Sequence, residues 1–320
     1  MGFFAAENLV LNFSNERVDA HNFWPKKGNF KGEQMFAARL SQKDGLAPFR
    51  AIAIGHNDDA EYQRCVGHLL DALDQIPNRP DYAFDHFFRI IDVAGSSLIP
   101  TNGIRGVVQG ASSALLLEDK EAWEQIIDVL CAHMPLRTYE FLAKRLINLS
   151  DTGSEEHKRL LKRSVHTLGS KFFNAFSAKY ALDINGNFIA NAAEENRANA
   201  AKLLKLYMSG KPGTRLKTAS DPALDLTKQP NVPNFARRSE VLASLLLFTI
   251  RNERAHGSVI SPFRTSRSTL GRYESYYFIM LLAYTFALGI LSLRFKCISL
   301  PNILTGLQEN IEVQKAFFSK

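Results

Sequence analysis

Arg251, Asn252 and His256 are the residues whose types and spacing could do chemistry. They end an almost wholly apolar segment, residues 240–250, and Gly257 after them is a common helix stop. An arginine side chain offers a planar fork of donors to phosphate oxygens, and a histidine exchanges protons near neutral pH. Together these side chains indicate a site that binds a phosphate group and moves a proton at it.

The spacing alone is not distinctive, because three other arginines are followed by a histidine after a similar interval. Those pairs are Arg50 and His56, Arg79 and His86, and Arg159 and His166. Asn252 distinguishes the fourth match, because it lies four residues before His256 and therefore shares a helix face with it. Arg251 and His256 are about 140° apart around an ideal helix, so one chain holds them on diverging sides. The alternative is a surface helix end whose Arg254 and His256 cap the last carbonyls.

The segment Arg-Asn-x-x-x-His-Gly ends an apolar helix and precedes a basic loop and a second long apolar helix. In this it resembles the HEPN superfamily of helical proteins, over the C-terminal half of the chain. Arg251, Asn252 and His256 match the family motif position by position. The resemblance implies a metal-independent endoribonuclease, of the kind found in toxin–antitoxin and phage-defence systems, with no cofactor. It also implies a homodimer, because in the family the motifs of two protomers meet across a two-fold interface to form a composite site.

The expected reaction is cleavage of RNA by its own 2′-hydroxyl group, leaving a 2′,3′-cyclic phosphate and a 5′-hydroxyl. His256 is the expected general acid or base, Arg251 stabilises charge on the phosphate, and Asn252 positions the group by a hydrogen bond. The family setting also implies a regulatory or antitoxin protein as a partner. Two alternatives stay open: a non-catalytic HEPN-like module or partner subunit that binds RNA or nucleotides, and a helical scaffold that binds DNA or protein.

Positive charge is concentrated around the motif. The chain has 320 residues and a formal net charge of +7 at pH 7, and residues 235–296 alone hold nine basic and three acidic residues, a balance of +6. Clustered basic residues are typical of nucleic-acid surfaces, although they also solubilise helix ends. The arginines predicted to bind RNA are Arg237, Arg238, Arg254, Arg264, Arg267 and Arg272.

Cysteine and histidine spacing predicts neither a disulfide nor a metal site. Cys65, Cys131 and Cys297 are far apart in the sequence, which is typical of a reducing compartment. No spacing typical of metal ligands is found among the other histidines, which are His21, His68, His86, His133, His157 and His166. The N-terminus lacks the basic and apolar regions of a signal peptide, so we expect a cytoplasmic protein.

Helical periodicity predicts a mainly α fold, divided at the polar segment 150–154. Residues 151–320 are expected to form a HEPN-like helical bundle, and residues 1–150 an accessory domain of unknown role. In the first half the expected helices are 57–75, 82–93, 118–132 and 139–149, and residues 35–40 and 49–54 predict a short β-hairpin. In the second half the expected helices are 154–182, 188–208, 236 to the motif, 272–296 and 302–318. The proline-rich segment 209–234 is expected to connect two of them.

Residues 276–293 contain no charged side chain and are long enough to cross a membrane. A buried helix in a bundle explains the same pattern, because such a helix is apolar on all sides. We therefore expect no membrane association.

Overall fold

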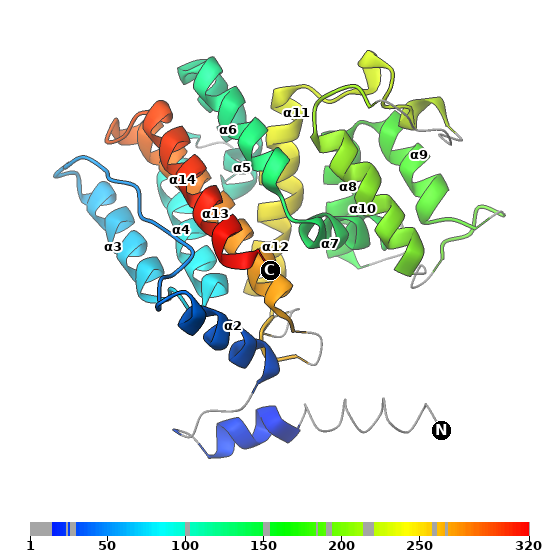
Figure 1. The fold of residues 1–320 in the computed structure, drawn as a ribbon. Coiled ribbons are helices and arrows are strands. Elements are labelled where there is room, and N and C mark those ends of the chain that lie inside the picture. Colours follow the sequence, from blue (N-terminus) through cyan, green and yellow to red (C-terminus); the bar gives the residue numbers. More distant parts are fainter. Residues whose placement is uncertain are drawn as a thin grey trace.

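The computed structural model of the protein consists of α-helices and the segments that connect them (Figure 1). It describes residues 15–23, 25, 30–99, 103–149, 154–183, 185–189, 194–213, 221–257, 261–265 and 268–319. A short helix over residues 15–22 comes first. The other helices of the first half are α2 (Lys31–Gln42), α3 (Ala60–Asp74), α4 (Pro80–Leu98), α5 (Gly103–Glu118), α6 (Lys120–His133) and α7 (Leu136–Ile147). Those of the second half are α8 (Glu155–Leu168), α9 (Ser170–Tyr180), α10 (Glu194–Met208), α11 (Phe235–Glu240), α12 (Phe248–Ala255), α13 (Leu270–Phe295) and α14 (Leu300–Phe318). The described residues form no β-strand, so the mainly α fold class is confirmed.

The long apolar helix α13 is the centre of the fold. It is buried without a break from Tyr277 to Ser292 and packs against α4 and α14, as well as α5 and α2. By length and composition it could cross a membrane, but 83% of its most apolar 18-residue window is buried inside the protein. Burial by neighbouring helices thus accounts for the apolar sequence without a membrane.

The β-hairpin predicted for residues 35–40 and 49–54 is wrong. Residues 35–40 lie within α2, which buries Phe36 on one face. The ring of Phe36 stacks on that of Tyr273 in α13, with centroids 4.1 Å apart. Packing against α13 therefore selects a helix in a segment whose short apolar run also suits a strand.

Residues 49–54 have no regular secondary structure and pair with no strand among the described residues. Instead, the side-chain amide of Asn310 in α14 accepts from the N–H of Arg50 at 2.8 Å and donates to its carbonyl at 2.9 Å. The N–H of Ile52 donates to the hydroxyl of Tyr284 in α13 at 2.8 Å. Side chains of two helices therefore satisfy backbone groups that a neighbouring strand satisfies in a hairpin.

Capping residues account for the helix ends that the sequence predicts well. The Asp59 carboxylate accepts from the N–H groups of Glu61 and Tyr62 at the start of α3, as its position suggests. Asp119 caps α6 in the same way, and this cap separates α6 from α5. No helix is predicted over α5, which contains three glycines, residues of low helix propensity.

The single helix predicted over residues 154–182 is two helices, α8 and α9. Gly169 separates them with φ +82° and ψ 139°, a conformation that is almost confined to glycine. A Cβ on this residue would also lie 3.1 Å from Nη1 of Arg237. This turn places α9 beside α8 and α10, and Figure 1 shows these three helices together at one end of the molecule.

Gly169→Ala is expected to lower the free energy of unfolding by about 1–3 kcal/mol, because alanine is strained in this conformation. Gly67→Ala is the matched control, since Gly67 lies in α3 and a Cβ there meets no atom within 4 Å. That change is expected to stabilise the protein by up to about 1 kcal/mol, through helix propensity. Urea titrations measure both values, and a shift of the same sign in the two variants would contradict the assigned role of Gly169.

Helices before and after residue 150 share one hydrophobic core, which extends from Phe36 in α2 to Phe317 in α14. Across this position α13 packs on α4, and α10 packs on α7. The division into residues 1–150 and 151–320 stays a prediction. The helices of the first part share their hydrophobic core with those of the second.

Candidate functional site

The predicted motif lies at the end of a continuous helical run formed by α11, a π-helical segment (Val241–Leu247) and α12. Every residue of the π-helical segment is buried, and burial continues to Ile250. Such segments are frequent at functional sites, and their wider turn changes the direction of the side chains that follow. Arg251 is the first residue after the buried stretch.

Arg251 and Asn252 contact each other at this point. Nη1 of Arg251 donates to Oδ1 of Asn252 at 3.2 Å, and Nη2 lies 3.9 Å from a carboxylate oxygen of Asp92 in α4. The Arg251 side chain is 33% exposed and that of Asp92 is 42% exposed. A contact this long between partly exposed charges is a weak ion pair, so the guanidinium is accessible to a ligand.

His256 is exposed and forms the C-cap of α12. Its backbone N–H donates to the carbonyl of Asn252 at 3.0 Å, so the two residues lie one helical turn apart. Gly257 follows with φ +66° and ends the helix. Because helical hydrogen bonding continues through His256, the divergence of about 140° from Arg251 expected for an ideal helix applies here.

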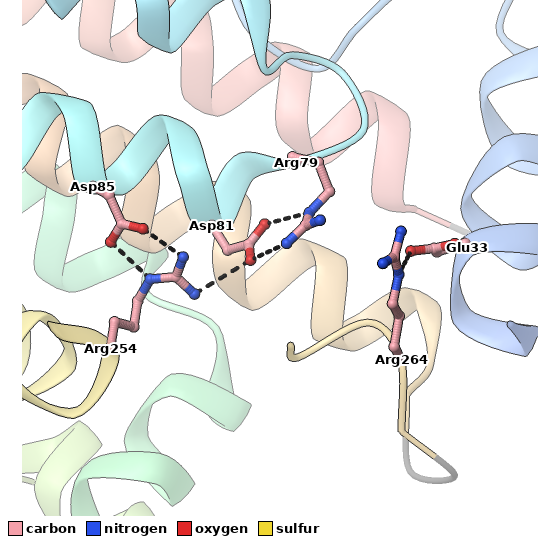
Figure 2. A network of polar contacts seen from close by, with 6 residues as sticks. All are labelled: Glu33, Arg79, Asp81, Asp85, Arg254 and Arg264. Atoms are coloured by element: carbon pink, nitrogen blue, oxygen red, sulfur yellow. Dashed lines mark hydrogen bonds and ion pairs between the residues drawn. The ribbon is translucent and has the colours of Figure 1, made fainter. Parts of the chain in front are cut away.

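Glu253 and Arg254, which lie between the predicted functional residues, attach α12 to two neighbouring helices. Arg145 of α7 donates from Nε and Nη2 to the two carboxylate oxygens of Glu253. Arg254 donates from Nε and Nη2 to the two oxygens of Asp85 in α4, at 2.7 and 2.5 Å, and from Nη1 to Asp81 at 3.2 Å (Figure 2). Bidentate pairs of this kind fix both distance and orientation. The end of α12 is therefore held from two sides.

Asp81 is the buried centre of this network. Its carboxylate also accepts from Nε and Nη2 of Arg79, at 2.9 and 2.8 Å, so it lies between two guanidinium groups (Figure 2). Burial by itself lowers the pKa of Arg254, but the hydrogen bonds and charges of Asp85 and Asp81 raise it above its ordinary value. Arg254 is therefore a permanently charged anchor of α12 on α4.

Two of the arginines predicted to bind RNA are buried or largely buried, and their guanidinium groups are bound by carboxylates and backbone. Arg254 is 10% exposed in the network described above. Arg238 is 2% exposed, and its Nη1 donates to Asp128 at 2.7 Å and to the carbonyl of Met208 at 3.5 Å. We assign both arginines a structural role rather than an RNA contact, because moving either one into solvent breaks these bonds.

Three of the remaining predicted arginines lie within the described residues and are more accessible. Arg237 is exposed at the edge of a hollow of about 990 Å³ beside α9. Arg264 pairs with Glu33 at 2.8 Å, and its side chain is 43% exposed (Figure 2). Arg272 is half-buried in the first turn of α13, and Arg267 lies outside the described residues.

A buried cation against the motif-bearing helix was missed by the sequence reasoning. Arg163 in α8 is 7% exposed, its Nη2 donates to the Thr249 hydroxyl at 3.1 Å, and its guanidinium lies 4.6 Å from the ring centroid of Phe248. Its Nε has no hydrogen-bond partner among the described residues. Burial and the nearby charge of Arg105 lower the pKa of Arg163 to about 10. No local pattern separates Arg163 from exposed residues of the same basic helix, because only the fold determines its burial.

The chain matches none of the protein-family models, curated proteins or solved structures with which it was compared. The resemblance to the HEPN superfamily therefore rests on the motif and on the order of helices around it.

Proposed function

We propose that the protein is a HEPN-like, metal-independent endoribonuclease and that Arg251, Asn252 and His256 form its reaction site. The observation that carries this proposal is the contrast within the motif. Glu253 and Arg254 are bound to α7 and α4, whereas Arg251 is accessible and His256 is exposed. A reacting group needs this combination of a rigid support and an accessible side chain.

The RNA supplies the nucleophile in the proposed reaction. An imidazole of His256 removes the proton of a 2′-hydroxyl, whose oxygen then attacks the adjacent phosphorus. The bond from phosphorus to the 5′-oxygen breaks, and an imidazolium returns a proton to that oxygen. Arg251 donates to the nonbridging oxygens as charge grows on them, and Asn252 holds the phosphate or the Arg251 guanidinium in place. The net charge of +6 over residues 235–296 supports attraction of the RNA backbone.

Two copies of the chain complete the proposed site. The side chains of Arg251 and His256 diverge around α12, so one copy does not bring both to the same phosphate. A second copy related by a two-fold axis supplies the missing side chain, so that each site combines Arg251 of one copy with His256 of the other. We place the activity in the cytoplasm and, as the resemblance implies, in a toxin–antitoxin or phage-defence setting. There a regulatory or antitoxin protein holds it in check.

Incubation of end-labelled single-stranded RNA with the protein in EDTA tests the proposal. We expect internal cleavage that leaves a 2′,3′-cyclic phosphate and a 5′-hydroxyl. The matched control is an oligonucleotide of the same sequence with 2′-deoxyribose throughout, which lacks the nucleophile and is expected to stay intact. Tight RNA binding without cleavage would favour a non-catalytic module, and the absence of both binding and cleavage would favour a scaffold.

A further inference from the structure

Two histidines and an aspartate from α3 and α4 meet outside the site described above. Nδ1 of His68 lies 3.7 Å from Oδ2 of Asp71, and Nδ1 of His86 lies 3.5 Å from the same carboxylate oxygen. The three ligand atoms that these side chains offer all lie within 4.8 Å of one another. His68 and Asp71 are three residues apart on α3, and packing of α4 on α3 brings His86 to them.

The two ring nitrogens lack partners in this arrangement. Nδ1 of His68 and Nδ1 of His86 are buried atoms without a hydrogen bond among the described residues. Their distances to Asp71 are longer than those of ordinary hydrogen bonds between nitrogen and oxygen. Buried polar atoms without a partner are rare, and a bound ion is one of the features that satisfies them.

We propose that His68, Asp71 and His86 bind one Zn²⁺ ion. Zinc binds imidazole nitrogen and carboxylate oxygen at about 2.0–2.2 Å in tetrahedral geometry, which sets ligand atoms about 3.4 Å apart. The two distances to Asp71 are close to that separation. Three protein ligands leave the fourth position to water, and two imidazoles favour zinc over magnesium or calcium.

The electrostatic surroundings suit a cation at this place. The charged and titratable groups that face the ring of His86 are Arg89, Asp71, His68 and Asp85. The carboxylates of Asp71 and Asp85 supply negative charge against that of Arg89. The ion then bridges α3 and α4. Its ligand His86 follows Asp85, whose carboxylate binds Arg254 at the end of α12. This role is separate from RNA cleavage, because the ion does not contact the proposed reaction site.

Isothermal titration of the metal-stripped, untagged full chain with ZnCl₂ tests the site. We expect one equivalent to bind per chain. His86→Gln and Asp71→Asn are each expected to weaken binding by more than about 100-fold, since loss of a ligand costs more than loss of its supporting contacts. His157→Gln is the matched control, because this histidine is exposed on α8 away from the cluster, and its affinity is expected to be unchanged.

Thermal unfolding supplies a second measurement. Zinc at 100 times its dissociation constant is expected to raise the unfolding midpoint of the unaltered chain by about 4 °C. In EDTA, circular dichroism should show that all variants fold alike. Absence of a one-equivalent binding event, or equal zinc binding and midpoint shifts in Asp71→Asn and the unaltered chain, would overturn the proposal. RNA cleavage by Asp71→Asn in EDTA is a separate readout, so failure of the zinc site and failure of the nuclease site are distinguishable.

Discussion

Arg254→Met is expected to lower the free energy of unfolding by about 3–5 kcal/mol, the range for breaking a buried ion pair by removing one partner. The change keeps a side chain of similar length but removes the bonds to Asp85 and Asp81. Asp81 is 0% exposed and keeps only Arg79, and Asp85 loses its bidentate partner. The carboxylate of Asp81, which stays buried after losing a charged donor, is the main source of the expected loss.

Arg264→Met is the matched control, because Arg264 too is paired with a carboxylate. Its carboxylate partner is Glu33, and its side chain is 43% exposed (Figure 2). Solvent screens such a pair, so the expected loss is below about 1 kcal/mol. Urea titrations of the two variants and the unaltered chain measure the difference. Losses of similar size in both variants would contradict the role of Arg254 as a buried anchor.

His256→Ala and Arg251→Ala are each expected to reduce the rate of RNA cleavage by about 10²- to 10⁴-fold. This is the range for loss of a general acid or base, and loss of a donor to developing charge lies within it. Arg251→Lys is expected to recover little of the rate, because an ammonium group cannot form the two-pronged contact of a guanidinium. Single-turnover assays in EDTA measure the cleavage step directly.

Two controls accompany these variants. His166→Ala removes another histidine, whose side chain is 68% exposed and contacts Glu240, and cleavage is expected to be unchanged. Because Arg251 and His256 are accessible, their alanine variants should also unfold close to the midpoint of the unaltered chain. Full cleavage by either variant would contradict the assigned site.

Mixing the two inactive variants tests the composite site. A heterodimer of Arg251→Ala and His256→Ala carries one intact Arg251 and one intact His256, so it is expected to recover part of the activity that each variant lacks. Sedimentation analysis shows whether the mixed dimers form. Dimers without recovered cleavage would contradict a site shared between two copies.

Much of the helical framework could be predicted because its signals are local. Asp59 marks the start of α3 as an N-cap, α13 is apolar over most of its length, and α14 repeats apolar residues at helical spacing. The predictions that failed depend on distant contacts or on a single backbone angle. Residues 35–40 are helical because Phe36 packs on α13, and residues 49–54 are bonded by side chains of α13 and α14. Gly169 divides an otherwise continuous helical pattern through a backbone conformation that its neighbours do not indicate.

The candidate site divides in the same way. By itself the sequence determined the helical class, the chemical types at Arg251, Asn252 and His256, and the helix end that presents them, because these depend on residues close together in the chain. Only the tertiary structure decided that Arg254 is an anchor, since its partners Asp81 and Asp85 lie about 170 residues earlier. The charge of an arginine and its spacing in the sequence do not indicate whether its side chain is buried. The sequence does not distinguish an arginine that contacts phosphate from one that holds two helices together. The two differ in whether the fold places a carboxylate beside the guanidinium.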